Sequence, residues 1–137
     1  MIKNVILSLV WFLSIPCAQA ETMSEAQQFG TLAGVALACG SKALYKYEEI
    51  VSRYFANTSP NEAVEKELKN QYVRAKVGGY RLQKKKMSDC PDTLIRFAQM
   101  PLMQFSLYSD GSLQTPQGQY LLPRGQKSPL PSASKIY

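Results

Sequence analysis

Two cysteines, Cys39 and Cys90, constrain this chain more than any other feature. In an oxidising compartment they would form one intramolecular disulfide, the only such pairing that two cysteines allow. The loop that this bond closes is long, so the chain-entropy model predicts a stabilisation of about 4 kcal/mol. A small domain has a total free energy of unfolding of only about 5–15 kcal/mol. A free nucleophile and a metal ligand are the alternative roles of the pair.

Residues 1–20, MIKNVILSLVWFLSIPCAQA, predict that the chain is exported. Lys3 precedes an apolar stretch from Val5 to Ile15, and Ala18-Gln19-Ala20 fits a small-x-small cleavage site. The stretch is shorter than the roughly 20 apolar residues that span a bilayer, so we expect no transmembrane segment after cleavage. We predict a signal peptide at 1–20, which removes Cys17, and a periplasmic mature chain, with secretion as the alternative. A retained anchor and a lipoprotein attached at Cys17 are the other interpretations.

The chain contains no histidine, which excludes Ser-His-Asp and Cys-His catalytic arrangements. Two cysteines without histidine do not complete a tetrahedral zinc site either. Gly78-Gly79 lacks the glycine spacing of nucleotide-binding loops. We therefore predict no catalytic residue, no metal ligand and no cofactor, and a protein that is not an enzyme. A carboxylate pair of the glycosidase kind stays open, because neighbours in space are invisible in a sequence.

The predicted mature chain is basic. Removing Lys3 from the 16 lysines and arginines leaves fifteen, against 10 aspartates and glutamates, a net charge of +5. The excess is concentrated between Lys69 and Arg96, and it suits a membrane face, a glycan or an acidic protein. The candidate contacts with such an anionic partner are Arg81, Lys84, Lys85 and Lys86. A solvated surface is the alternative role of these cations, and we expect no nucleic-acid partner because none of the recognised motifs occurs.

Residues 21–100 predict a helical domain. Thr22 and Glu25 fit a capping box, so a first helix should extend from Met23 to Cys39. One side of it carries small residues at every fourth position: Gly30, Gly34 and Ala38. Because a glycine inside a helix costs about 1 kcal/mol relative to alanine, this stripe predicts that another helix approaches closely within the core.

Two further helices follow. Ser41 is expected to cap a helix over 42–56, whose apolar residues have helical spacing. Ser59 is expected to cap the third helix, with Pro60 in its first turn. Gly78-Gly79 should interrupt or kink it. Its expected buried stripe comprises Ala63, Val64, Leu68, Tyr72, Ala75 and Val77.

A fourth helix is predicted from Asp89 to about Gln99, with a proline in its first turn. Its expected buried residues are Leu94, Ile95 and Ala98, with Phe97 beside them. Residues 101–122 contain a turn signal at Asp110-Gly111 and predict either a β-hairpin or an extended strip over the helices. Residues 123–137, rich in proline and serine, predict a flexible tail. The expected fold class is mainly α: a small bundle of about four helices with one disulfide, followed by an extended or hairpin C-terminal segment.

The stretch AGVALACGSK, a second cysteine before a short helix, and the later PRGQ resemble small exported accessory proteins of Gram-negative secretion systems, such as the Dot/Icm type. The resemblance implies an accessory role and transfers no site residues. The sequence thus predicts a non-enzymatic accessory or structural component of a cell-envelope assembly, with protein partners in the envelope. The alternative is a stand-alone periplasmic binding protein, chaperone or inhibitor that uses a basic patch on an acidic ligand.

Overall fold

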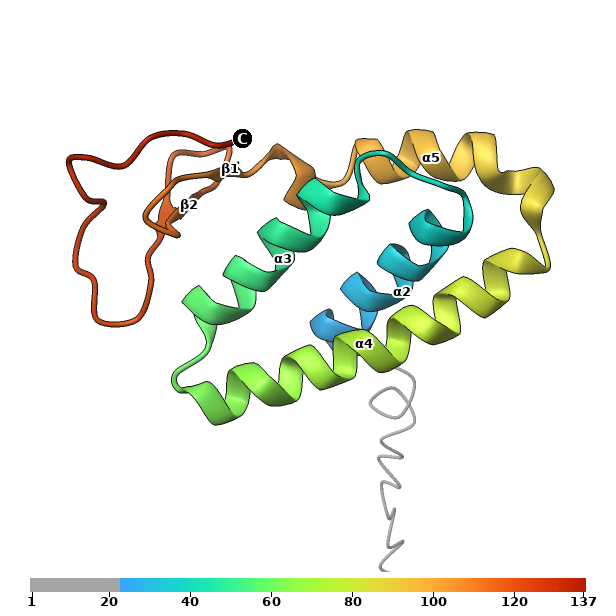
Figure 1. Ribbon diagram of the computed structural model, residues 1–137, viewed down its shortest axis with the longest axis horizontal. Coiled ribbons are helices and arrows are strands. Elements are labelled where there is room, and N and C mark those ends of the chain that lie inside the picture. Colours follow the sequence, from blue (N-terminus) through green and yellow to red (C-terminus); the bar gives the residue numbers. More distant parts are fainter. Residues whose placement is uncertain (1–22) are drawn as a thin grey trace, which may run out of the picture.

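The computed structural model describes residues 23–137, so the predicted signal peptide at 1–20 lies outside the described residues. The described part is mainly helical, as Figure 1 shows. Its helices are α2 (Glu25–Ala38), α3 (Leu44–Thr58), α4 (Glu62–Lys84) and α5 (Cys90–Ala98), with short 3-10 turns η1 (Met87–Asp89) and η2 (Pro101–Gln104) on either side of α5. Within this part, no helix combines the length and the apolar character that crossing a membrane requires.

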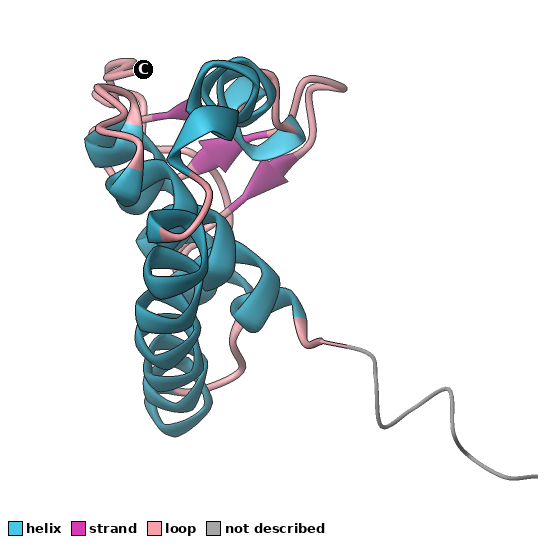
Figure 2. Cartoon of the chain, turned by 90° about the vertical axis from the view of Figure 1, so that its right-hand side faces the viewer, coloured by secondary structure: helices cyan, strands magenta, loops and turns pink. Residues whose placement is uncertain are grey.

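Helices α2 and α4 lie side by side and run in the same direction (Figures 1 and 2). A Cβ atom added at Gly30 would overlap the carbonyl oxygen of Tyr72, and one added at Gly34 would overlap that of Lys76. Gly79 of α4 meets the backbone of Thr31 in the same way. The predicted close approach of a helix to this stripe is therefore confirmed, and α4 is the helix that makes it.

An aromatic cluster fills the core between α2, α3 and α5. Tyr47 and Phe55 of α3 are both buried. The Tyr47 ring packs edge-on against Phe97 of α5, with centroids 4.8 Å apart, and its hydroxyl donates a 2.9 Å hydrogen bond to the carbonyl of Phe29 in α2. Phe29 in turn contacts the rings of Tyr54 and Phe55. One helix, α3, therefore holds the positions of both of its neighbours in this cluster.

Cys39 and Cys90 form the predicted disulfide, with Cα atoms 5.3 Å apart. Cys39 follows the last residue of α2, and Cys90 is the first residue of α5. The side-chain amide of the buried Gln83, near the end of α4, donates a 2.9 Å hydrogen bond to the Lys86 carbonyl in the connection to α5. The bond and this connection together fix α5 against the C-terminal end of α2.

The C-terminal part forms a small antiparallel sheet of order β1-β2-β3, consisting of β1 (Ser106–Leu107), β2 (Leu113–Gln114) and β3 (Tyr120–Leu121). Leu107 pairs with Leu113, and Leu113 pairs with Leu121. Leu107 and Leu113 are buried and belong to the same core as the aromatic cluster. Of the two conformations predicted for 101–122, the structure therefore contains the hairpin, joined by a third short strand.

Residues 123–137 differ from the predicted flexible tail, because they run back along the sheet. The Ser109 amide donates to the Ser134 carbonyl (2.8 Å), and the Ile136 amide donates to the Leu107 carbonyl (2.7 Å). Asp110 accepts hydrogen bonds from the Gln126 side chain (2.8 Å) and the Leu130 amide (3.0 Å). A composition rich in proline and serine does not reveal these contacts, since most of them use backbone groups.

Three helix starts differ from the predicted ones. The N-cap of α2 is Ser24, which shares a capping box with Gln27 in place of the predicted pair Thr22 and Glu25. The N-cap of α3 is Ala43, and the hydroxyl of Ser41, two residues earlier, accepts a hydrogen bond from the Ala43 amide. Helix α4 begins after Asn61, whose side chain accepts from the Val64 amide (2.9 Å), whereas Ser59 ends α3. At α2 and α4 a neighbouring polar residue caps the helix instead, whereas α3 has no side-chain cap.

Helix α4 continues without interruption through Gly78-Gly79, contrary to the prediction. Packing against α2 compensates for the low helix propensity of Gly79. The predicted buried stripe of α4 is also wrong in part, because Ala63, Val64 and Val77 are exposed. The buried residues of α4 are Tyr72, Gly79 and Gln83. The side of α4 that faces α2 is thus set by the glycine and not by the valines.

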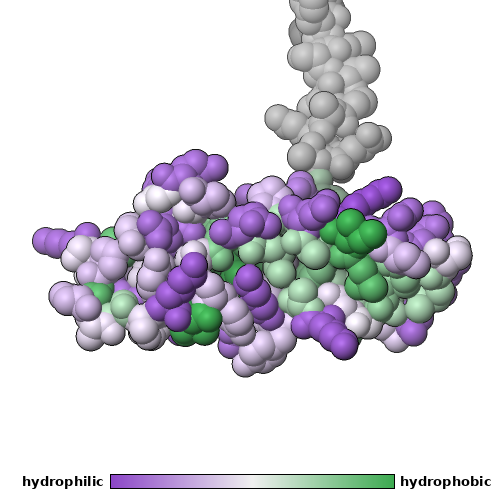
Figure 3. Space-filling view, turned by 90° about the horizontal axis from the view of Figure 1, so that it is seen from above, coloured by the Kyte–Doolittle hydropathy of each residue, from purple (hydrophilic) through white to green (hydrophobic). Residues whose placement is uncertain are grey.

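Helix α5 buries Phe97, while Ile95 and Ala98, both predicted to be buried, are exposed. Phe97 alone reaches the aromatic cluster because the disulfide fixes which side of this short helix faces α2. Seen from above, apolar side chains gather over the half of the molecule that carries α5 (Figure 3). Exposed Ile95 is one of the apolar residues of this helix that solvent reaches.

Candidate functional site

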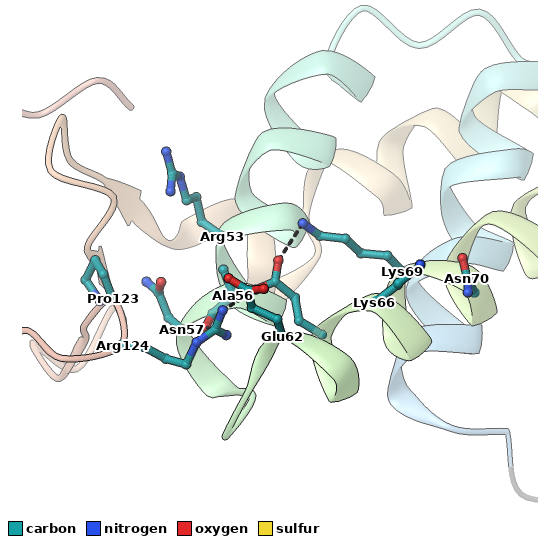
Figure 4. Close-up of a pocket in the computed structure, with 10 residues that line it drawn as sticks. Arg53, Ala56, Asn57, Glu62, Lys66, Lys69, Asn70, Pro123 and Arg124 are labelled. Atoms are coloured by element: carbon teal, nitrogen blue, oxygen red, sulfur yellow. Dashed lines mark hydrogen bonds and ion pairs between the residues drawn. The ribbon is translucent and has the colours of Figure 1, made fainter.

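A cleft of about 900 Å³ opens where α3 ends, α4 begins and the C-terminal segment passes between them (Figure 4). We call it the basic cleft. Its cations come from all three elements: Arg53, Lys66, Lys69 and Arg124. The carboxylates of its lining are those of Glu62 and Glu65, so four positive charges face two negative ones. The excess of two positive charges gives the cleft a positive potential, which suits an anionic group.

Glu65 organises one wall of the basic cleft. Its carboxylate accepts from the Lys69 ammonium at 2.7 Å and pairs with the Arg124 guanidinium at 3.0 Å. The guanidinium also donates a 2.9 Å hydrogen bond to the Ala56 carbonyl at the end of α3. The hydrogen bond from Lys69 is the main cause that holds the pKa of Glu65 below its ordinary value, and Arg124 adds to it. Glu65 is therefore a fixed anion that positions two of the four cations.

The opposite wall depends on the turn between β1 and β2. The Asn57 side-chain amide donates 2.8 Å hydrogen bonds to the carbonyls of Gly111 and Leu121, which joins the end of α3 to the sheet. The Arg53 guanidinium lies against Gly111, where any side chain would crowd it. Gly111 has a φ of +87°, a conformation that glycine adopts readily. Because Gly111 has no side chain, the Arg53 guanidinium can lie directly against this turn.

Two cations of the basic cleft are available to a partner. Among residues 23–137, neither Arg53 nor Lys66 forms an ion pair, and both side chains are exposed. Lys69 and Arg124 are already engaged by Glu65. An incoming carboxylate would thus meet two free cations beside a wall that is already ordered, which limits the side-chain entropy lost on binding.

The basic cleft presents cations and a carboxylate, Glu65, that its neighbours stabilise in the charged form. A general acid at neutral pH needs a raised pKa, whereas the pKa of Glu65 is lowered. Nor does the described part of the chain hold any group of three or more Cys, Asp or Glu side chains placed to ligate a metal ion. Ion pairing with an anionic group is the interaction that the lining offers.

The cations predicted from the sequence lie elsewhere. Arg81 and Lys84 are in the last turn of α4, and Lys85 and Lys86 follow directly. All four are exposed, and the Lys84 ammonium lies 5.2 Å from the centre of the Tyr80 ring. None of the four lines the basic cleft. Their position also suits the negative end of the helix dipole, which is a structural reason for cations there.

The sequence alone did not reveal the basic cleft, although it contained one part of it. The i,i+4 spacing of Glu62 with Lys66 and of Glu65 with Lys69 predicts two ion pairs. The structure confirms the second, at 2.7 Å, whereas Glu62 and Lys66 form no ion pair among the described residues. Arg124 belongs to a segment predicted to be flexible, so its contact with Glu65 had no signal in the sequence. Arg53 appeared as part of the polar side of α3, with nothing to indicate that the turn at Gly111 lies against it.

Comparison of the chain with protein-family models, with curated proteins and with solved structures gives no match.

Proposed function

We propose that this chain acts after export as a non-enzymatic binding protein of the cell envelope, an accessory component that docks an acidic segment of a protein partner in the basic cleft. The observation that carries the proposal is the excess of positive charge in that cleft, where Arg53 and Lys66 lack ion-pair partners among the described residues. Complementary charge of this kind accelerates encounter and selects the partner.

The shape and lining of the basic cleft favour a segment of a macromolecule over a small molecule. Small-molecule sites are enclosed and mostly apolar. The lining here is charged or amide-bearing apart from Ala56 and Pro123, and it is assembled from three elements at the surface. An extended acidic segment can reach Arg53 and Lys66 from solvent without being buried.

A binding experiment tests this proposal with matched variants. The full chain, exported into the periplasm of a bacterial host, is titrated against a fluorescein-labelled oligoglutamate peptide at low salt, with fluorescence anisotropy as the readout. Arg53→Gln/Lys66→Gln should weaken binding about 5- to 30-fold, taking about 0.5–1 kcal/mol for each exposed ion pair. Arg81→Gln/Lys85→Gln removes the same charge from the end of α4 and should change the affinity little.

The basic end of α4 is the second candidate for the contact with an acidic ligand. It corresponds to the alternative function, that of a stand-alone binding protein. It is favoured by one observation: Arg81, Lys84, Lys85 and Lys86 are exposed together. If the α4 variant loses affinity and the cleft variant does not, this second candidate replaces the first. If the wild-type chain does not bind the peptide at low salt, both are wrong.

Export is tested separately. When the chain is expressed from Met1, with residues 1–20 unchanged, the protein recovered from the periplasm should begin at Glu21. Mass spectrometry determines this N-terminal residue. A chain that stays in the cytoplasm, or that keeps residues 1–20, would contradict the export part of the proposal.

A further inference from the structure

A second surface feature, distinct from the basic cleft, lies between α2 and α4. It is an apolar groove of about 540 Å³ that shares no lining residue with the cleft. We call it the α2–α4 groove, and its lining residues on α4 include Arg74, Ala75, Gly78 and Leu82. The other side of the groove includes Thr31 of α2 and Met23, which precedes that helix. Leu82 is 63% exposed and Met23 48% exposed, so apolar surface is presented to solvent along both helices.

Gly78 is the residue of this groove that the fold itself does not explain. Gly30, Gly34 and Gly79 each allow the close approach of α2 to α4. A Cβ atom at Gly78, in contrast, would have no atom within 4 Å to meet. In the interior of a helix such a glycine lowers stability for no intramolecular gain. It leaves the groove open at its middle, which is where a partner's backbone could approach α4 closely.

The charges around the α2–α4 groove indicate which kind of partner fits it. Arg74 lines it, and no carboxylate does. At 100° per residue, Arg81 and Lys85 lie on the same side of α4 as Gly78, one and two turns further on. Glu67 lies on this side two turns before Arg74, and its carboxylate contacts the Arg74 guanidinium at 3.5 Å. The apolar floor thus leads towards a basic end.

We propose that the α2–α4 groove binds an amphipathic helix of a partner protein, with apolar residues facing Gly78 and Leu82 and acidic residues facing Arg81 and Lys85. A helix laid in a groove between two helices contributes apolar anchors at positions i, i+3, i+4 and i+7. A second copy of this chain fits less well, since two copies would bring the cations of this side of α4 together. The inference does not rest on the proposed role of the basic cleft.

The test begins with a selection. A library of displayed peptides is selected on the full, disulfide-bonded chain and counter-selected on Gly78→Leu, whose new side chain should fill the groove without meeting any atom near its Cβ. An unfolding midpoint of Gly78→Leu that is no lower than that of the wild type confirms that the variant folds. The enriched peptides should combine apolar residues at helical spacing with aspartate or glutamate. No enrichment, or enrichment of basic or proline-rich peptides, would overturn the proposal.

An enriched peptide is then measured by anisotropy on single variants. Leu82→Ser and Arg81→Gln/Lys85→Gln should each weaken binding at least five-fold. One control should leave it unchanged: Ile95→Ser, which removes a similarly exposed apolar side chain on α5. Equal loss in the Ile95 control would show non-specific adhesion and reject the groove. Dimerisation of the free chain that Gly78→Leu abolishes, seen by sedimentation, would assign the groove to a second copy and contradict the proposal.

Discussion

The adjacent glycines Gly78 and Gly79 meet different surroundings, and each predicts its own response to substitution. Gly79→Ala places a Cβ atom against the Thr31 backbone, so it should lower the free energy of unfolding by about 1–3 kcal/mol through overpacking. Gly78→Ala meets no atom and should raise the free energy of unfolding by up to about 1 kcal/mol through helix propensity. Urea unfolding of the two variants measures both effects. Equal responses would contradict the packing of α2 on α4.

Asp110 predicts a pH-dependent contribution to stability. Partial burial alone would raise the pKa of its carboxyl, but hydrogen bonds from Ser112, Leu130 and Gln126 outweigh burial and hold the pKa well below its ordinary value. A lowered folded-state pKa stabilises the fold above the unfolded pKa of about 3.9. This stability is lost as the pH falls through that value towards the folded pKa.

Asp110→Asn should therefore be less stable than the wild type by about 1.5–3 kcal/mol near neutral pH, the scale of a hydrogen bond to a charged group. The difference should shrink as the pH falls below about 4. Urea unfolding at a series of pH values measures it. A difference that is independent of pH would show that the Asp110 charge does not contribute.

At the scale of elements, the Cys39–Cys90 disulfide holds α5 against α2. Replacing both cysteines by serine should lower the free energy of unfolding by about 4 kcal/mol, the chain-entropy value for a loop of this length. Guanidinium unfolding of the double variant, compared with the oxidised wild type, checks the value. An unchanged midpoint would mean that the α4 connection alone fixes α5.

The C-terminal segment predicts a pattern of hydrogen exchange. The Leu107 and Ser109 amides donate to the carbonyls of Tyr137 and Ser134, so both should exchange slowly in the full chain. Truncation after Ser132 removes both acceptors and should accelerate exchange at these two amides. Rapid exchange at both sites in the full chain would instead support the flexible tail that the composition predicts.

These elements also show how far the sequence predicts this structure. The disulfide, the helices and the close approach at Gly30 and Gly34 follow from local rules: an even pair of cysteines, apolar periodicity and small residues at helical spacing. Several neighbouring polar residues could cap each helix, and several apolar residues of α5 could be buried. Which of them is used depends on the packing of the whole fold, as the exposure of Ile95 shows. The basic cleft required contacts between α4 and Arg124, which no local pattern encodes.

At the scale of the whole molecule, α4 connects two surfaces of different character. Its first turns form one wall of the basic cleft, and its second half lines the apolar α2–α4 groove and ends in exposed cations. A chain with these two surfaces and an engaged C-terminal segment suits contact with more than one protein segment. The proposed function is assigned to the basic cleft, so binding of an acidic segment there is the first property to measure.

The most direct measurement is therefore a chemical-shift titration of the isotope-labelled full chain with oligoglutamate at low salt. The account predicts saturable shifts at the backbone amides around Arg53, Lys66, Lys69 and Arg124, and small shifts at the end of α4. Shifts confined to residues 81–86, or shifts that grow without saturation over the whole surface, would contradict the central claim that the basic cleft is the binding site.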